Sequence, residues 1–479
     1  MSNTSKVNTY LVVAIYALTF ALTHLLDIPS PNAAAIFLST TILWFTELLP
    51  LAITALIVPI LAVFTGVLDP KASFALFGDP ILFLFIGSFL LAGAMEKHGW
   101  DKRIAYLVLS RAWASKSIDR LCTILALICW TLSMWISNTA TCAIMTPMVL
   151  GIGQTLKDQL NSEKDSKALT QRLLLITAFA SSIGGMATPV GSPPNLIALS
   201  LLKEQDISIS FLQWMGFGVP ISLLMLIALL LLLRLRMPVQ AKSISSVSLL
   251  FKSQLHQLGR LKRSELIIAF VFLIAVVGWI SPDLFSSLYP EAAFTKSISA
   301  RLNMGVVGLF SAMMLFILRD EQKAPILNWN DTHFINWSVI LLFGGGLCLG
   351  KILDVSMLAT HISNIVFFGI FSSDIGLIII TILFAILLSE FSSNTASASI
   401  LVPIVLAQVI GSPTDFIIAV SVAVALGASC GFMLPVSTPP NAIIYGTGKI
   451  ELRAMIKNGI SFDVIGFMVI SLMLIIRTI

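Results

Sequence analysis

The chain has 479 residues, of which 57% are hydrophobic and 11% are charged, with a formal net charge of +5 and a mean hydropathy of +0.96. A soluble domain is about one-quarter charged, so this chain cannot cover itself with polar surface, and its solvent must be lipid. A helix satisfies its own backbone hydrogen bonds inside the bilayer. The composition therefore excludes a soluble fold and predicts an all-α integral membrane protein.

Eleven apolar segments approach or reach the length of roughly 20 residues that a bilayer crossing requires. These expected crossings lie near residues 7–27, 33–49, 51–67, 80–97, 170–203, 211–236, 264–282, 302–318, 337–354, 415–447 and 458–477. Two more apolar segments, 120–155 and 375–412, are too long for one crossing and must return to the side on which they start. We interpret both as re-entrant hairpins.

The basic residues are sorted by loop instead of forming one patch, which argues against nucleic acid as a partner. Lys and Arg gather in the loops 97–120, 157–172, 234–263 and 449–457, whereas the loops between them carry few. The positive-inside rule places the basic loops in the cytoplasm. We therefore expect a multi-pass protein of the cell inner (plasma) membrane, with a cytoplasmic N-terminus and an external C-terminus.

Two motifs occur twice in the same order. SNTAT at 137–141 recurs as SNTAS at 393–397, and PVGSPPN at 189–195 recurs as PVSTPPN at 435–441. Two ordered matches indicate a duplicated unit of five crossings and one hairpin. Because five is odd, the second copy is inverted, which is a common plan of secondary transporters.

The duplication divides the chain into four parts. We expect an N-terminal helix in residues 1–32, a first inverted repeat in 33–236, a cytoplasmic basic linker in 237–263 and a second inverted repeat in 264–479.

The Ser-Asn-Thr motifs predict a site for an anion. Asn and Ser favour turns and helix caps, so at a hairpin tip they open the chain and start a half-helix. Such a start exposes unpaired N–H groups and a partial positive charge, which suits a carboxylate or sulfate oxygen. The hydroxyl groups of Thr139 and Thr395 and the amides of Asn138 and Asn394 can add donors.

The Pro-Pro-Asn motifs predict sites for a small cation. Proline breaks a helix and removes a donor, so breaks at Ser192–Pro194 and Ser437–Pro440 leave free carbonyl groups in the membrane. Ser133 and Ser389 lie one turn before each hairpin tip, on the same helix face as the motif serine. Each repeat thus offers hydroxyl, amide and carbonyl oxygens, which predicts two quasi-equivalent cation sites that flank one anion site.

Other polar residues have simpler interpretations. Glu390 is an acid inside the second hairpin, but Met134 occupies its position in the first, so we favour a structural role over direct coordination. The five cysteines lie in apolar stretches without metal-ligand spacing. The sequence contains no HExxH motif and no nucleophile–His–acid set, so we do not expect an enzyme. The segment 101–120 resembles an interfacial amphipathic helix.

The doubled motifs, together with Trp44-x-x-Glu47-x-x-Pro50, resemble the divalent anion:sodium symporter family, whose members carry dicarboxylates, citrate and sulfate. The resemblance implies a homodimer in which a transport domain moves like an elevator against a fixed scaffold. The substrate-binding residues that it implies are Asn138, Thr139, Ser192, Ser393, Asn394, Thr395, Thr438 and Pro439. The sodium ligands that it implies are Ser133, Ser137, Asn138 and Gly191 in one site and Ser389, Ser392, Asn394 and Ser437 in the other.

The leading hypothesis is therefore sodium-coupled symport of a C4-dicarboxylate (succinate, malate or fumarate), with at least two sodium sites. No Lys, Arg or His enters the expected cation sites, which favours symport over a sodium-independent dicarboxylate exchanger. A sodium-coupled sulfate or citrate carrier on the same fold remains an alternative. An ion channel and a membrane-embedded enzyme are disfavoured, since neither a charged pore ring nor a catalytic set is present.

Overall fold

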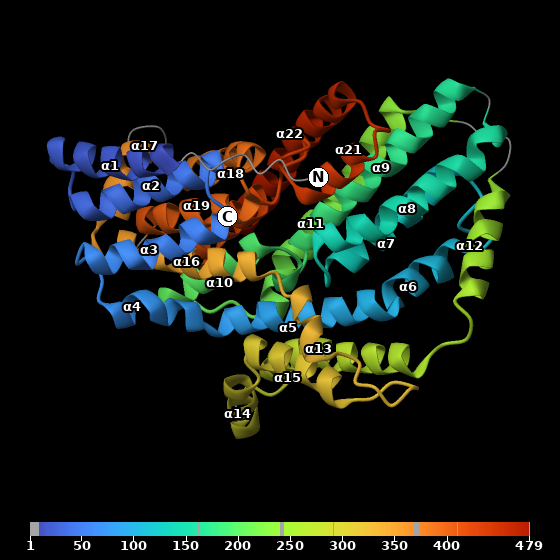
Figure 1. Cartoon of the computed structure of the whole chain (residues 1–479), viewed down its shortest axis with the longest axis horizontal. Coiled ribbons are helices and arrows are strands. Elements are labelled where there is room, and N and C mark those ends of the chain that lie inside the picture. Colours follow the sequence, from blue (N-terminus) through green and yellow to red (C-terminus); the bar gives the residue numbers. More distant parts are fainter. Residues whose placement is uncertain are drawn as a thin grey trace.

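The structure, a computed structural model, describes residues 9–160, 162–239, 244–290, 292–367, 373–409 and 411–478. Within these ranges the chain is helical apart from turns, loops and one isolated β-bridge between Arg319 and Pro325. The helices form one elongated bundle (Figure 1). Parts of the expected crossing 7–27, of the linker and of the second hairpin fall outside the described residues.

The helices follow one another along all the described ranges. The α-helices up to residue 257 are α1 (Thr9–Leu25), α2 (Pro31–Thr46), α3 (Leu51–Phe64), α4 (Pro70–Ala75), α5 (Pro80–His98), α6 (Trp100–Leu109), α7 (Ile118–Ser133), α8 (Asn138–Leu156), α9 (Glu163–Met186), α10 (Pro193–Glu204), α11 (Phe211–Arg236) and α12 (Ser245–Gln257). The later ones are α13 (Arg263–Leu288), α14 (Ala293–Arg301), α15 (Met304–Ile317), α16 (Trp337–Val355), α17 (Leu358–Phe367), α18 (Asp374–Phe391), α19 (Asn394–Gln408), α20 (Thr414–Ala428), α21 (Pro439–Gly446) and α22 (Leu452–Thr478). Short 3-10 helices are η1 (Leu76–Gly78), η2 (Lys157–Gln159), η3 (Pro189–Gly191) and η4 (Trp329–Phe334).

The expected membrane character is confirmed, whereas the count of crossings stays a prediction. Seven helical segments of the described ranges are long and apolar enough to cross a bilayer, and shorter apolar helices accompany them. The structure adds three short helices that no sequence pattern indicates, namely α4, α14 and α17. It also places α12 inside the basic linker and an amphipathic helix, α6, at the start of the segment 101–120.

The helices are interrupted at each expected hairpin tip and at each expected break, while the return of the hairpins to one side of the membrane stays a prediction. The segments 134–137 and 392–393 join α7 to α8 and α18 to α19, respectively. The expected crossing 170–203 is divided into α9 and α10, and 415–447 is divided into α20 and α21. Each second half-helix begins at a proline, because the missing N–H of proline is harmless in the first turn.

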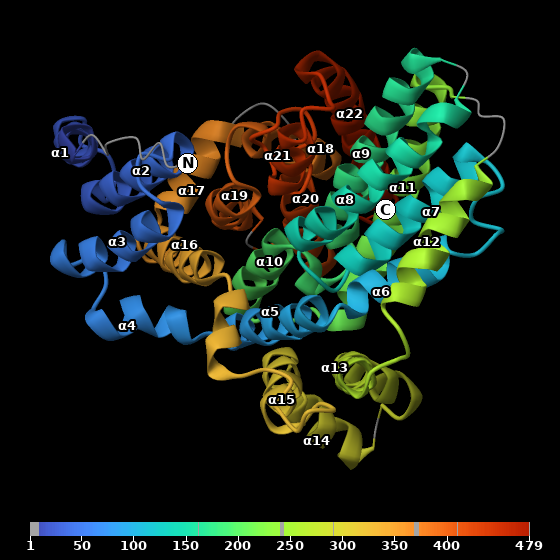
Figure 2. The ribbon, with the colours of Figure 1, turned by 45° about the vertical axis from the view of Figure 1, so that its right-hand side comes forward.

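Contacts between helices occur in matched pairs. α3 packs on α16 as α15 packs on α5, and α7 packs on α9 as α18 packs on α20. Likewise, α21 contacts α8 while α10 contacts α19, so each half-helix after a break meets the hairpin of the other half of the chain. Figure 2 shows these last four helices together in the middle of the molecule. The matched contacts support a duplicated unit, while the inversion and the domain boundaries stay predictions.

The contact between α5 and α15 depends on close approach of two backbones. A Cβ atom added to Gly87 would lie 2.3 Å from the carbonyl carbon of Gly308, so the two helices would have to separate. We expect Gly87→Ala to destabilise the protein by about 1–3 kcal/mol, the usual effect of overpacking. Thermal unfolding of the purified protein in detergent measures this loss. Gly78→Ala is the matched control because no atom lies within 4 Å of its added Cβ, and equal melting temperatures for the two variants would contradict the prediction.

Candidate functional site

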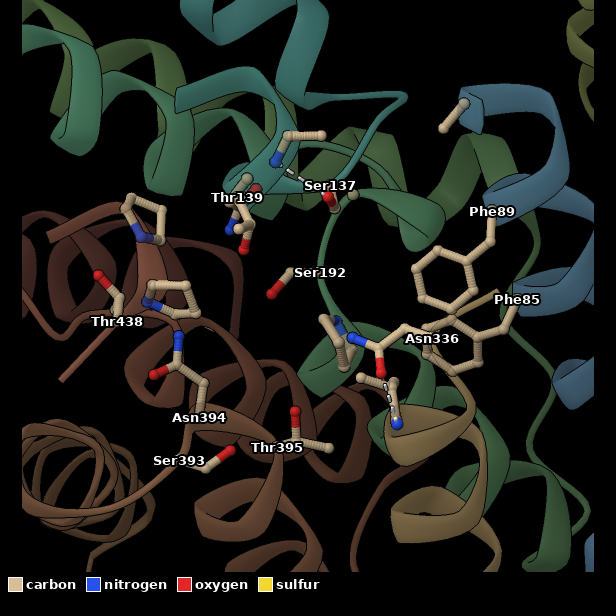
Figure 3. Close-up of a pocket in the computed structure, with 18 of the residues that line it drawn as sticks. Phe85, Phe89, Ser137, Thr139, Ser192, Asn336, Ser393, Asn394, Thr395 and Thr438 are labelled. Carbon is tan, nitrogen blue, oxygen red and sulfur yellow. Dashed lines mark hydrogen bonds between the residues drawn. The ribbon is translucent and has the colours of Figure 1, made fainter. Parts of the chain in front are cut away.

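The two hairpin tips and the two helix breaks surround one cavity of about 850 Å³. All eight expected substrate-binding residues line it, three from the first half of the chain and five from the second. They are Asn138, Thr139, Ser192, Ser393, Asn394, Thr395, Thr438 and Pro439. In Figure 3, Thr139, Ser192, Ser393, Asn394, Thr395 and Thr438 lie around the same open space. The assignment of substrate to these residues stays a prediction.

The expected sodium ligands divide into two groups. Ser137, Asn138, Gly191, Asn394 and Ser437 line the cavity. Ser133, Ser389 and Ser392 do not, and Ser133 and Ser389 are fully buried behind the asparagines. Ser133 Oγ donates to Asn138 Oδ1 at 2.7 Å, and Ser389 Oγ lies at the same distance from Asn394 Oδ1. Because each Oδ1 faces a serine, the amide NH₂ group remains as a donor for another acceptor.

Oxygen atoms gather behind the second tip. Ser389 Oγ lies 2.7 Å from Asn394 Oδ1 and 2.6 Å from the carbonyl oxygen of Ala428. A hydroxyl group has one proton and can satisfy only one of these two acceptors at a time. Three converging oxygens with a single donor proton form a set that suits a small hard cation.

A corresponding set lies behind the first tip, next to Gly185. A Cβ atom on Gly185 would lie 2.4 Å from Asn138 Oδ1 and 2.9 Å from the carbonyl oxygen of Gly191. Both oxygens, together with Asn138 Nδ2 at 2.8 Å, therefore border the same small volume, which a side chain at position 185 would fill. The two oxygen sets support the two expected cation sites, although their occupancy stays a prediction.

The half-helices that begin at the tips aim their N-termini at the cavity. Ser137 caps α8, since its Oγ accepts from the N–H of Ala140 at 3.2 Å. Ser393 occupies the same position before α19 but forms no side-chain cap, so that the hydroxyl and the first N–H groups are both available. Two helix starts of this kind bring partial positive charge to the cavity from opposite halves of the chain.

Two buried asparagines hold the breaks in shape. Asn195 Nδ2 donates to the carbonyl oxygens of Gly185 and Thr188, both at 2.8 Å. Asn441 Nδ2 donates in the same way to Gly431 and Leu434, both at 3.0 Å. The acceptors are ten and seven residues earlier in each case. The asparagine of each Pro-Pro-Asn motif thus satisfies carbonyl groups that the interrupted helix leaves free, a role that the repetition of the motif signalled but the sequence analysis did not assign.

Other residues of the cavity were missed because no motif marks them. Phe85 and Phe89 on α5 and Asn336 before α16 face the same space (Figure 3). Glu96 also lines it. Glu47, by contrast, belongs to the Trp44-x-x-Glu47-x-x-Pro50 motif and lines the cavity too. Trp44 Nε1 donates to the carbonyl oxygen of Leu51, which fixes the turn after α2. Of the described residues that line the cavity, none is basic. An anion with two charges would therefore meet helix ends, neutral donors and the carboxyl groups of Glu47 and Glu96, but no fixed cation.

A helical membrane protein in which broken helices and hairpin tips meet at one central cavity has the architecture of a secondary transporter. A family model described as the sodium:sulfate symporter transmembrane region matches residues 2–477, and the chain belongs to this family. The match confirms the resemblance to divalent anion:sodium symporters, and the chain is a multi-pass membrane transporter, not an enzyme.

Full-length relatives agree with this placement. The chain is 33% identical over 482 residues to an uncharacterized transporter of Haemophilus influenzae, covering 98% of this chain and 97% of the relative. It is 32% identical over 441 residues to the sodium-dependent dicarboxylate transporter SdcS of Staphylococcus saprophyticus, covering 90% and 82% of the two chains. SdcS of Staphylococcus aureus (strain USA300) is 31% identical over 468 residues, covering 96% and 88%.

Among solved structures, the YdaH transporter of Alcanivorax borkumensis superimposes with a TM-score of 0.53 at 12% identity. The match covers 84% of this chain and 85% of that chain. At this identity the likeness concerns the fold alone.

Proposed function

We propose that the protein is a sodium-coupled symporter of a divalent anion, and that its substrate is a C4-dicarboxylate such as succinate, malate or fumarate. The observation that carries the proposal is a cavity formed by two helix N-termini and lined by no basic residue among those described. A dianion in such a cavity needs positive co-ions by charge balance. The name of the SdcS relatives, sodium-dependent dicarboxylate transporter, points to the same chemistry.

In this proposal the anion lies between the two tips, and the sodium ions lie behind them. The amide groups of Asn138 and Asn394 face the anion with their N–H donors, while their Oδ1 atoms face the serines and the cations. A cavity of about 850 Å³ accommodates a four-carbon diacid. We also propose, from the family resemblance, that the substrate is moved by an elevator mechanism and that the protein assembles as a homodimer.

Uptake of labelled succinate into proteoliposomes tests the proposal. We expect accumulation with an inward sodium gradient and none with an equal potassium gradient, in vesicles whose membrane potential is clamped to the same value. Protein-free vesicles are the control. Uptake that ignores sodium but requires internal dicarboxylate would establish an exchanger instead. If the vesicles took up no succinate but accumulated sulfate or citrate with sodium, the proposed sodium coupling would stand and the proposed substrate would be wrong.

A further inference from the structure

Glu390 joins the second hairpin to the second helix break. It lies in the last turn of α18 and is only 4% exposed. Its Oε1 accepts from the backbone N–H of Met433 at 2.9 Å, and its Oε2 accepts from that of Leu434 at 3.3 Å. Ser437 Oγ lies 2.7 Å from Oε2 and 2.9 Å from the carbonyl oxygen of Glu390 itself. The side chain thus holds both the loop between α20 and α21 and an expected sodium ligand.

The first half of the chain has no such carboxylate. Met134 occupies the corresponding position, and its backbone carbonyl oxygen accepts a hydrogen bond from the hydroxyl group of Thr188. One hydroxyl–carbonyl contact therefore connects the first tip to the first break, where the second copy has a carboxylate with three donors. The two expected cation sites are alike in their Ser–Asn pairs but unlike in charge.

A second buried carboxyl group lies beside Glu390. Asp463 on α22 is 7% exposed, and its carboxyl group lies within hydrogen-bonding reach of Glu390. Glu390 receives three donors, whereas Asp463 Oδ1 has no partner. The three donors therefore hold the carboxyl group of Glu390, and Asp463 receives none of them. In the described ranges neither group forms an ion pair with Lys, Arg or His.

On the basis of the proposed sodium coupling, we infer that Glu390 is a positioning residue of the second cation site and that, because of it, this site binds sodium more tightly than the first. Glu390 does not line the cavity, so it does not touch the anion. It directly follows Ser389 of the oxygen set in the chain and holds Ser437 by a hydrogen bond. Ser437 and Ser389 border the same position, since a Cβ atom added to Gly431 would lie 3.3 Å from Ser437 Cβ and 3.4 Å from Ser389 Oγ. A buried negative charge without a fixed partner favours a cation nearby, and the first site lacks this contribution.

Glu390→Gln tests the inference, because it keeps the size of the side chain and removes its charge. We expect the sodium concentration for half-maximal uptake to rise about tenfold or more. Maximal uptake and the KM for succinate at saturating sodium should stay within about twofold. A purely structural defect would instead lower protein yield or maximal uptake without moving the sodium dependence. The rise in melting temperature that sodium produces in the absence of substrate gives a second readout, which does not depend on transport.

Three further variants make the test decisive. Glu390→Asp keeps the carboxyl group, so its sodium dependence should lie between those of the wild type and Glu390→Gln. If the glutamine variant does not accumulate in the membrane, the comparison of Glu390→Asp with the wild type tests the inference in its place. Asp463→Asn leaves Glu390 and its three donors in place and should leave the sodium dependence unchanged. Asp374→Asn, which alters an exposed carboxyl group at the other end of α18, is the matched control.

Wild-type sodium dependence in Glu390→Gln, or an equal loss in Asp463→Asn, would overturn the inference. A wild-type protein that shows no response to sodium would overturn the proposed function instead, so the two failures are distinguishable.

Discussion

We expect sodium-driven uptake to be abolished by Asn138→Ala and equally by Asn394→Ala, while the protein remains in the membrane. This is one of the two largest effects that we expect. Each amide has two tasks in the proposed site. Its Oδ1 lies 2.7 Å from Ser133 Oγ or Ser389 Oγ, in the oxygen set that suits a cation, and its NH₂ group is free for the anion. Alanine removes both, so substrate and cation lose a ligand together, and uptake should fall by at least about 100-fold.

Initial rates of succinate uptake, normalised to the amount of protein in the vesicles, measure this loss. Asn330→Ala is the matched control, because Asn330 is an exposed asparagine of η4 outside the cavity. Uptake near the wild-type rate in either tip variant would refute the assignment of that asparagine. If only Asn394→Ala lost uptake, the assignment of the second site would stand and that of the first would fall. The proposed equivalence of the two halves would also be weakened.

Arg103→Ala should produce the largest loss of stability. Arg103 on α6 is 5% exposed and Glu265 at the start of α13 is 2% exposed, and their side chains form an ion pair with Nε and Oε1 at 2.7 Å. Arg103 also donates to the carbonyl oxygen of Gly259 at 3.1 Å. It therefore ties the end of the basic linker to both helices. Removing one partner of a buried pair leaves an uncompensated charge, which destabilises a protein by about 3–5 kcal/mol.

Thermal unfolding in detergent measures the effect, with Arg111→Ala as the control at an exposed arginine of the same basic loop. Combining Arg103→Met with Glu265→Met removes both charges, and we expect this double variant to be more stable than Arg103→Ala. Equal melting temperatures for Arg103→Ala and Arg111→Ala would show that the pair contributes nothing. A double variant less stable than the single one would assign the effect to the carbonyl contacts of Arg103 instead of the unpaired charge.

The local features of the site could be predicted from short stretches of sequence. SNTA motifs inside apolar segments marked the tips at 138 and 394, and Pro-Pro-Asn marked the breaks before α10 and α21. Helix starts, caps and proline breaks depend on residues within one or two turns, so such features are readable without tertiary information. Composition alone likewise determined the membrane class, because a chain with 11% charged residues has no soluble alternative.

Only the tertiary structure could show which of these groups meet. The carbonyl oxygen of Ala428 next to Ser389, Phe85 and Asn336 in the cavity wall, and Asp463 beside Glu390 all come from segments without a distinctive motif. The partners of Glu390 lie more than 40 residues away along the chain. A backbone carbonyl or amide is present at every residue, so sequence cannot single one out as a ligand. That choice is made by the packing of α18, α20 and α22 against one another, which places ordinary backbone groups at the one point where buried polar side chains need them.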